Sequence, residues 1–176
     1  NTPFRRFKHF THEGGISTPL IAHWPQGIPR NRHNKLEHQP GHLVDLMATV
    51  IDVTGAKYTR EFKGKAIQPL EGVSLRPAFA GRPLKRTQPI FWEHEGNRAI
   101  RSGKWKLVSK YMDGWELYDI TADRVERNDL AAKHPDTVKK LAAEWEAWAK
   151  RASVDQWTGP RRTNWGDVPP QNGTTN

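Results

Sequence analysis

The sequence predicts a mixed chain, in which the end of an α/β domain is followed by a small antiparallel α+β unit. An apolar run at residues 17–24 (STPLIAHW) precedes an amphipathic helix at 42–53, the strand–helix order of an α/β domain. Short strand-like segments then follow one another between residues 89 and 120 with tight turns, which is typical of an antiparallel sheet. A second amphipathic helix at 135–151 completes this smaller unit.

In the first part, the run at 17–24 is predicted to be a mostly buried strand that ends at Pro25. The helix at 42–53 ends before Gly55 and carries apolar residues at helical spacing: Leu43, Leu46, Met47, Val50 and Ile51. Ser74 is expected to cap a short helical turn that ends at Gly81. Because one strand and one helix cannot build a core, we expect most of this domain to lie upstream.

The second part contains strands at 89–95 and 115–120, and between them a hairpin that turns at Ser102-Gly103. The helix at 135–151 carries one apolar stripe that would cover a face of the sheet: Val138, Leu141, Trp145 and Trp148. Beyond Val154 the composition predicts an extended or disordered tail. The predicted divisions are therefore 1–84, 85–152 and 153–176.

The composition excludes several classes of protein. With no cysteine among 176 residues, the chain has no disulfide, thiolate nucleophile or thiolate metal site. The net charge of +9 favours anionic partners, but the basic residues are scattered, so we expect no nucleic-acid partner. No apolar run approaches the roughly 18 residues that a membrane span needs. The first residue is Asn and no signal peptide follows it, so we expect the chain to be cut from a longer protein.

Lys8 is the first candidate for chemistry, because it stands five residues before Glu13-Gly14-Gly15. Glycines permit a tight turn with positive φ and let a backbone pass close to a ligand or another strand. A lysine ahead of such a turn can direct a compact positive charge at an anion. On the residues alone, a solvated lysine beside a structural Gly-Gly pair is the favoured interpretation.

Five stretches together resemble the type I sulfatases, and the likeness is greatest to the arylsulfatase branch. In order, they are KHFTHEGGISTPLIAHWP, HLVDLMATVIDVTGA, LEGVSLRPAFAG, FWEHEGNRAIRSGKWKLV and ELYDITADRVERNDLA. The first resembles the family segment in which a Lys precedes Glu-Gly-Gly and a strand that ends in Trp-Pro. The resemblance covers roughly residues 2 to 150 with no segment out of place.

This resemblance implies an alkaline-phosphatase-like α/β sandwich followed by a small antiparallel C-terminal domain. It implies hydrolysis of a sulfate ester, on a sulfated sugar or an aryl sulfate, by a formylglycine nucleophile beside Ca²⁺ held by Asp and Asn. The formylglycine motif and these metal ligands precede the matching segment in the family, and neither is found here. We therefore expect the segment alone to be inactive, to hold no metal ligands, and to derive from a secreted or periplasmic protein.

The resemblance assigns Lys8 as catalytic, because it matches the Lys that binds a sulfate oxygen and assists the leaving oxygen. His12, four residues further on, and His94, at the end of a predicted strand, are the candidates for substrate binding. Glu13 is expected to form a structural ion pair. Two alternatives stay open: a phosphodiesterase or phosphonate hydrolase of the same superfamily, and a non-catalytic anion-binding module. The sequence gives neither the substrate nor the oligomeric state.

Overall fold

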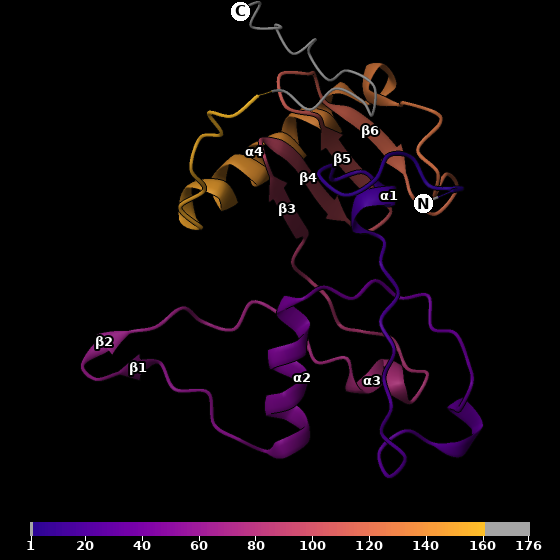
Figure 1. Cartoon of the computed structure of the whole chain (residues 1–176), viewed down its shortest axis with the longest axis vertical. Helices are drawn as coiled ribbons and strands as arrows, with labels where there is room; N and C mark the ends of the chain where they lie inside the picture. The colour runs from indigo at the N-terminus through magenta and orange to yellow at the C-terminus, as the bar shows by residue number, and fades with distance from the viewer. Residues whose placement is uncertain (1, 161–176) are drawn as a thin grey trace, which may run out of the picture. The chain divides into compact units, whose positions relative to one another are not determined.

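The computed structural model of the chain describes residues 2–160 (Figure 1). The chain forms two compact units: one contains residues 1–19 together with residues from Pro89 on, and the other is Leu20–Gln88. The N-terminal segment that carries Lys8 therefore belongs with the predicted α+β unit. The last sixteen residues of the predicted tail, 161–176, lie outside the described residues.

The first unit contains the predicted antiparallel sheet. Its strands are β3 (Ile90–His94), β4 (Asn97–Ser102), β5 (Trp105–Ser109) and β6 (Glu116–Asp119), and they pair in the order β3-β4-β5-β6. The hairpin between β4 and β5 turns at Gly103, as predicted. The hairpin between β3 and β4 turns through Glu95 and Gly96, which both have positive φ, at 52° and 76°. Positive φ at both central residues matches the right-handed twist of paired strands.

Helix α4 (Pro135–Arg151) covers one face of this sheet, in agreement with the predicted stripe (Figure 1). Leu141 and Trp145 pack on the strands, in a core completed by Ile100, Leu107, Leu117 and Ala149. The indole Nε1 of Trp145 donates a hydrogen bond to the carbonyl of Trp92 at 3.0 Å. The short helix η2 (Ala131–Lys133) leads into α4.

The opposite face of the sheet carries a second set of inward side chains. Strand residues alternate between the faces, so Lys106 and Tyr118 point away from the face that Leu107 and Leu117 present to α4. The N-terminal segment and its one-turn helix α1 (Glu13–Ile16) pack against this second face through hydrogen bonds and ion pairs. The sheet is therefore covered on both sides by parts of its own unit.

The unit Leu20–Gln88 holds η1 (Arg30–Arg32), α2 (Val44–Thr54), β1 (Glu61–Phe62), β2 (Lys65–Ala66) and α3 (Arg76–Phe79). Helix α2 and the short turn α3 confirm the predicted helices, each within two residues at either end. The predicted strand at 17–24 is wrong for this structure: no strand is present there, and residues 18–23 are exposed. A strand requires a neighbouring strand with which to form a ladder of hydrogen bonds, and no strand within residues 2–160 pairs with this segment.

Helix α2 holds the turn that follows it through two buried polar side chains. The Asp45 carboxylate accepts hydrogen bonds from the backbone N–H groups of His42 and Val73, at 2.7 and 2.9 Å, and pairs with Arg86. The hydroxyl of Thr49 accepts a hydrogen bond from the N–H of Leu75 at 2.8 Å. These contacts join two of the five resembling stretches to each other.

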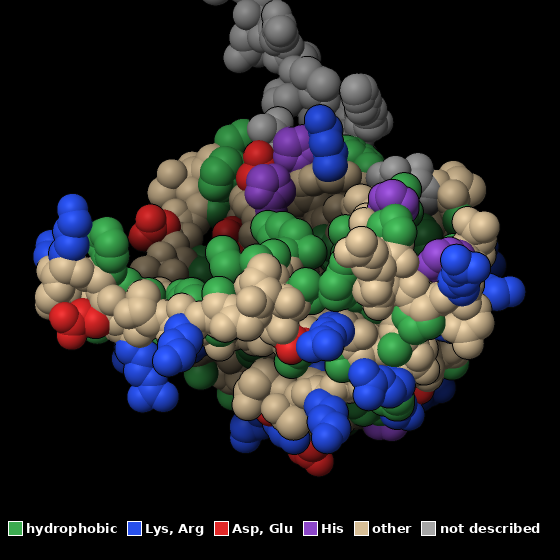
Figure 2. All heavy atoms as spheres, turned by 90° about the horizontal axis from the view of Figure 1, so that it is seen from below, with side chains coloured by type: hydrophobic (Ala, Val, Ile, Leu, Met, Phe, Trp, Pro, Cys, Tyr) green, Lys and Arg blue, Asp and Glu red, His purple; other side chains and the backbone are tan. Residues whose placement is uncertain are grey.

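The apolar stripe predicted for this helix is largely exposed. Leu43, Leu46, Met47 and Val50 show between 40% and 76% of their surface. Figure 2 shows hydrophobic side chains at the molecular surface, interspersed with Lys and Arg. An exposed stripe of this kind marks a surface that folded proteins ordinarily cover. No helix within residues 2–160 is long and apolar enough to cross a membrane.

Candidate functional site

Glu13 lies in a buried ionic cluster. Its Oε1 accepts a hydrogen bond from Lys106 Nζ at 2.8 Å, and the same Nζ lies 2.8 Å from Glu126 Oε1. The backbone N–H of Glu13 donates to Glu126 Oε2 at 2.9 Å. The exposed fractions of Glu13, Lys106 and Glu126 are 4%, 0% and 1%. The structure thus gives Glu13 the ion pair that the sequence predicted, and the cluster joins three of the five resembling stretches.

Gly14 and Gly15 allow the preceding loop to lie against α1. A Cβ at Gly14 would overlap the carbonyl oxygens of Arg5 and Arg6, and one at Gly15 would overlap that of Phe10. The N–H of Gly14 donates to the carbonyl of Arg5 at 2.8 Å. Neither glycine has positive φ, so close backbone approach, rather than a left-handed turn, requires glycine at both positions.

Replacing Gly15 with alanine is expected to lower the free energy of unfolding by about 1–3 kcal/mol, because the methyl group must displace backbone atoms. Gly114→Ala is the matched control: no atom lies within 4 Å of its built Cβ, so a change within about 0.5 kcal/mol is expected. Thermal unfolding of the two variants measures the difference. Equal melting temperatures would show that the close approach is not required.

Lys8 projects from the loop that these glycines support. The loop is fixed by Phe10, which is 3% exposed and meets Phe7 edge to face at 5.3 Å between ring centroids. Lys8 itself is exposed, and no ion pair is formed with it by any residue in 2–160. An unneutralised ammonium on an anchored loop is suited to meeting an anion.

His94 lies at the end of β3, and the structure brings it to the residue that follows Lys8. The rings of His9 and His94 stack at 5.7 Å between centroids, and His9 Nδ1 lies 3.0 Å from Glu95 Oε2. Buried Asn97 donates hydrogen bonds from Nδ2 to the carbonyls of His9 and His94, at 2.6 and 2.8 Å. Sequence reasoning missed His9, Glu95 and Asn97. The sequence signal that could have identified them is their position: His9 directly follows Lys8, and Glu95 and Asn97 follow His94 within three residues.

His12 is fully buried, with its Nε2 3.1 Å from Glu116 Oε2. Burial lowers the pKa of His12, although the neighbouring carboxylates oppose this effect. A neutral ring that donates to Glu116 satisfies this geometry. The structure thus gives His12 a partner inside the fold, and its contact with substrate stays a prediction.

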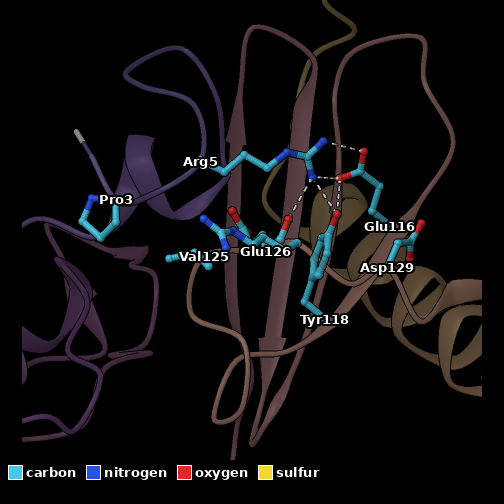
Figure 3. Close-up of a pocket in the computed structure, with 8 residues that line it drawn as sticks. Pro3, Arg5, Glu116, Tyr118, Val125, Glu126 and Asp129 are labelled. Carbon is cyan, nitrogen blue, oxygen red and sulfur yellow. Dashed lines mark hydrogen bonds and ion pairs between the residues drawn. The ribbon is translucent and has the colours of Figure 1, made fainter.

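Arg5 lies in a hollow of about 540 Å³ on the same unit (Figure 3). Its Nη1 donates to Glu116 Oε2 at 2.7 Å and to the Tyr118 hydroxyl at 2.6 Å, and that hydroxyl donates to Glu116 at 2.8 Å. Burial alone would raise the pKa of Glu116, but hydrogen bonds from His12, Arg5 and Tyr118 hold this pKa well below its ordinary value. These polar groups hydrogen-bond to one another, and their bonds anchor the N-terminal segment to strand β6 of the sheet.

The family profile described as N-sulphoglucosamine sulphohydrolase, C-terminal, matches residues 4–151. The chain belongs to the sulfatase family. This sulfatase chain is 30% identical over 159 residues to an uncharacterized sulfatase of Schizosaccharomyces pombe, covering 86% of the chain and 28% of the relative. It is 30% identical over 164 residues to the choline-sulfatase of Rhizobium meliloti, covering 84% and 30%.

Solved structures agree with this assignment. The sulfatase chain matches the crystal structure of Ps i-CgsB with a TM-score of 0.71 and 28% identity, over 85% of this chain and 32% of that one. The complex of Ps i-CgsB with k-i-k-neocarrahexaose gives 0.72 and 27%, over 94% and 36%. The sulfatase chain therefore has the predicted family fold and corresponds to a C-terminal portion. It spans about 30% of the length of the two curated relatives above.

Proposed function

We propose that this chain is the C-terminal portion of an enzyme that hydrolyses a sulfate ester, with Lys8 as its contribution to the active site. The observation that carries the proposal is the exposed Lys8 ammonium on a loop fixed by Gly14, Gly15 and the Glu13 cluster. The cluster joins α1, directly after this loop, to β5 through buried charges of Glu13 and Lys106, and breaking such a pair from one side is costly.

Lys8 would act by electrostatic stabilisation. Its ammonium can donate charged hydrogen bonds to the sulfate oxygens and to the leaving oxygen as negative charge develops there. The anchored loop holds the charge in place before the substrate arrives, which lowers the reorganisation needed in the transition state. His94 and His9, which stack on each other, offer donors for a hydroxyl of the sugar or for the sulfate.

Calcium, which the family resemblance implies, does not fit the residues of this segment. Ca²⁺ prefers six to eight oxygen ligands. Within residues 2–160, the His, Asp and Glu side chains close enough to share a metal are His9, His94 and Glu95, which offer two nitrogens and one carboxylate. We therefore derive no step through calcium from this part of the protein.

The rest of the large domain is proposed to cover the exposed stripe of α2. Within residues 2–160, Leu43, Leu46, Met47 and Val50 of this stripe remain 40–76% exposed, whereas Asp45 and Thr49 of the same helix are buried. Such packing would also supply neighbours for residues 17–24, which have strand-forming composition but no strand partner.

A sulfated sugar is favoured as the substrate over a small aryl sulfate. Ps i-CgsB, which this chain resembles at 27% identity, was solved with k-i-k-neocarrahexaose. The net charge of +9 would also favour an anionic polymer over a neutral one. The runner-up functions are phosphate-diester or phosphonate hydrolysis, and anion binding without turnover.

Turnover by the full-length protein tests the proposal. We expect it to release sulfate from 4-nitrophenyl sulfate or a sulfated carrageenan oligosaccharide. This hydrolysis should be faster than its hydrolysis of phosphonate monoesters and phosphodiesters, measured by the alcohol or phenol released. The 176-residue chain should show no turnover above buffer. Faster cleavage of the phosphorus esters would support the superfamily alternative. Binding of the oligosaccharide with no turnover of any ester would support a binding module.

A further inference from the structure

We infer that His9, His94 and Glu95 form a binding site for a divalent transition metal ion of the Zn²⁺ class. One ligand atom from each side chain can be chosen so that all three lie within 4.8 Å of one another. His9 Nδ1 and Glu95 Oε2 are already 3.0 Å apart, and the two imidazole rings lie 24° from parallel. Small side-chain rotations would bring the three atoms to the separation that ligands of one ion require.

The backbone beneath the cluster is fixed, which distinguishes it from a chance meeting of surface side chains. Asn97 is 2% exposed, and its Nδ2 donates to the carbonyls of His9 and His94 at 2.6 and 2.8 Å. Its Oδ1 accepts a hydrogen bond from the N–H of Tyr111 at 3.2 Å. One buried amide therefore joins the two segments that carry the imidazoles, although 85 residues separate His9 from His94 in the sequence.

Two of the three residues have left-handed backbone conformations. His9 has φ of 83° and Glu95 has φ of 52°, values that non-glycine residues seldom adopt. Glu95 is the first residue of the tight β3–β4 turn, and Gly96 is the second. Such conformations persist where surrounding contacts determine them: Asn97 binds the carbonyl of His9, and the tight hairpin turn holds Glu95.

The ligand atoms select the type of ion. Two imidazole nitrogens and one carboxylate oxygen suit Zn²⁺ and other first-row divalent ions, and this set is poor for Ca²⁺. Three protein ligands leave at least one coordination position for water or an anion. The side chains of His9 and Glu95 are 31% and 14% exposed and His94 is exposed, so an ion could enter from solvent.

An ion at this site would add positive charge at His9, the residue that directly follows Lys8. An open position on the ion could take an oxygen of a sulfate or of a sugar hydroxyl. This consequence rests on the proposed function. The metal site itself does not, because it follows from the geometry of three side chains.

Titration of the metal-free full-length protein with Co²⁺ and Zn²⁺ tests the site without any measurement of activity. We expect Co²⁺ to give the visible absorption of a site with nitrogen ligands, and Zn²⁺ to displace it. His94→Gln and Glu95→Gln should each weaken Zn²⁺ binding at least about 10-fold, the scale of losing one member of a metal site.

His38→Gln is the matched control, because His38 is exposed and outside the cluster. It should leave the titration unchanged, and circular dichroism should show that all variants are folded. The proposal is overturned if Zn²⁺ binds the His94→Gln and Glu95→Gln variants as tightly as it binds the unchanged protein. Absence of binding at millimolar Zn²⁺ would also overturn it, and the contact of His9 with Glu95 would then be an ion pair only. Sulfatase activity in a protein without this binding would leave the proposed function intact.

Discussion

Replacing Lys8 with alanine in the full-length enzyme is expected to lower kcat/KM for a sulfate ester by roughly 10² to 10³. This is the loss seen when one preorganised donor to developing charge is removed. The protein should stay folded, because the Lys8 side chain is exposed and the loop is held by Phe10 and the two glycines. Steady-state kinetics with circular dichroism as a folding control measures both quantities.

Two further variants separate charge from position. Lys8→Arg keeps the charge but should restore little activity, because a planar guanidinium does not place its charge where an ammonium does. Lys139→Ala removes an exposed lysine of α4 in the same unit and should leave kcat/KM unchanged. If Lys8→Ala has the same kcat/KM as Lys139→Ala, Lys8 is an ordinary loop lysine and the proposed site is wrong.

His94→Ala should lower kcat/KM by less than Lys8→Ala does. It should act mainly by raising KM.

The antiparallel unit could be predicted from the sequence because its signals are local. The stripe of Leu141, Trp145 and Trp148 sets the helix, and the turn at Gly103 sets a hairpin. The segment at 17–24 has equally strong strand composition, yet no strand forms in the structure. Strand composition is a local property, whereas a strand exists only when another segment supplies hydrogen-bond partners.

The candidate site could be predicted only where a residue carried its chemistry in a recognisable local pattern. Lys8 stood ahead of Glu-Gly-Gly, and Glu13 was expected to pair, but no pattern identified its partner. Lys106 lies 93 residues from Glu13, in a strand where alternation would place a lysine on a solvated face. The N-terminal segment covers that face, so the lysine is buried. His9 meets Glu95 for the same reason, since a contact across 86 residues is a property of the fold.

Replacing Lys106 with alanine is expected to lower the free energy of unfolding by about 3–5 kcal/mol, the cost of breaking a buried ion pair from one side. The variant would leave the carboxylates of Glu13 and Glu126 buried and facing each other with no cation between them. Urea denaturation of the full-length protein measures the loss.

Lys104→Ala is the matched control, because Lys104 is a lysine two residues before Lys106 in the sequence. Lys104 also forms an ion pair, with Asp119 at 3.0 Å, but its side chain is 53% exposed, so the expected loss is about 0–1 kcal/mol. Combining Lys106→Met with Glu13→Gln and Glu126→Gln should recover part of the stability, because no buried charge is then left unpaired. If Lys104→Ala and Lys106→Ala lower the free energy of unfolding equally, burial does not make the Lys106 ion pairs more stabilising than the exposed Lys104 pair.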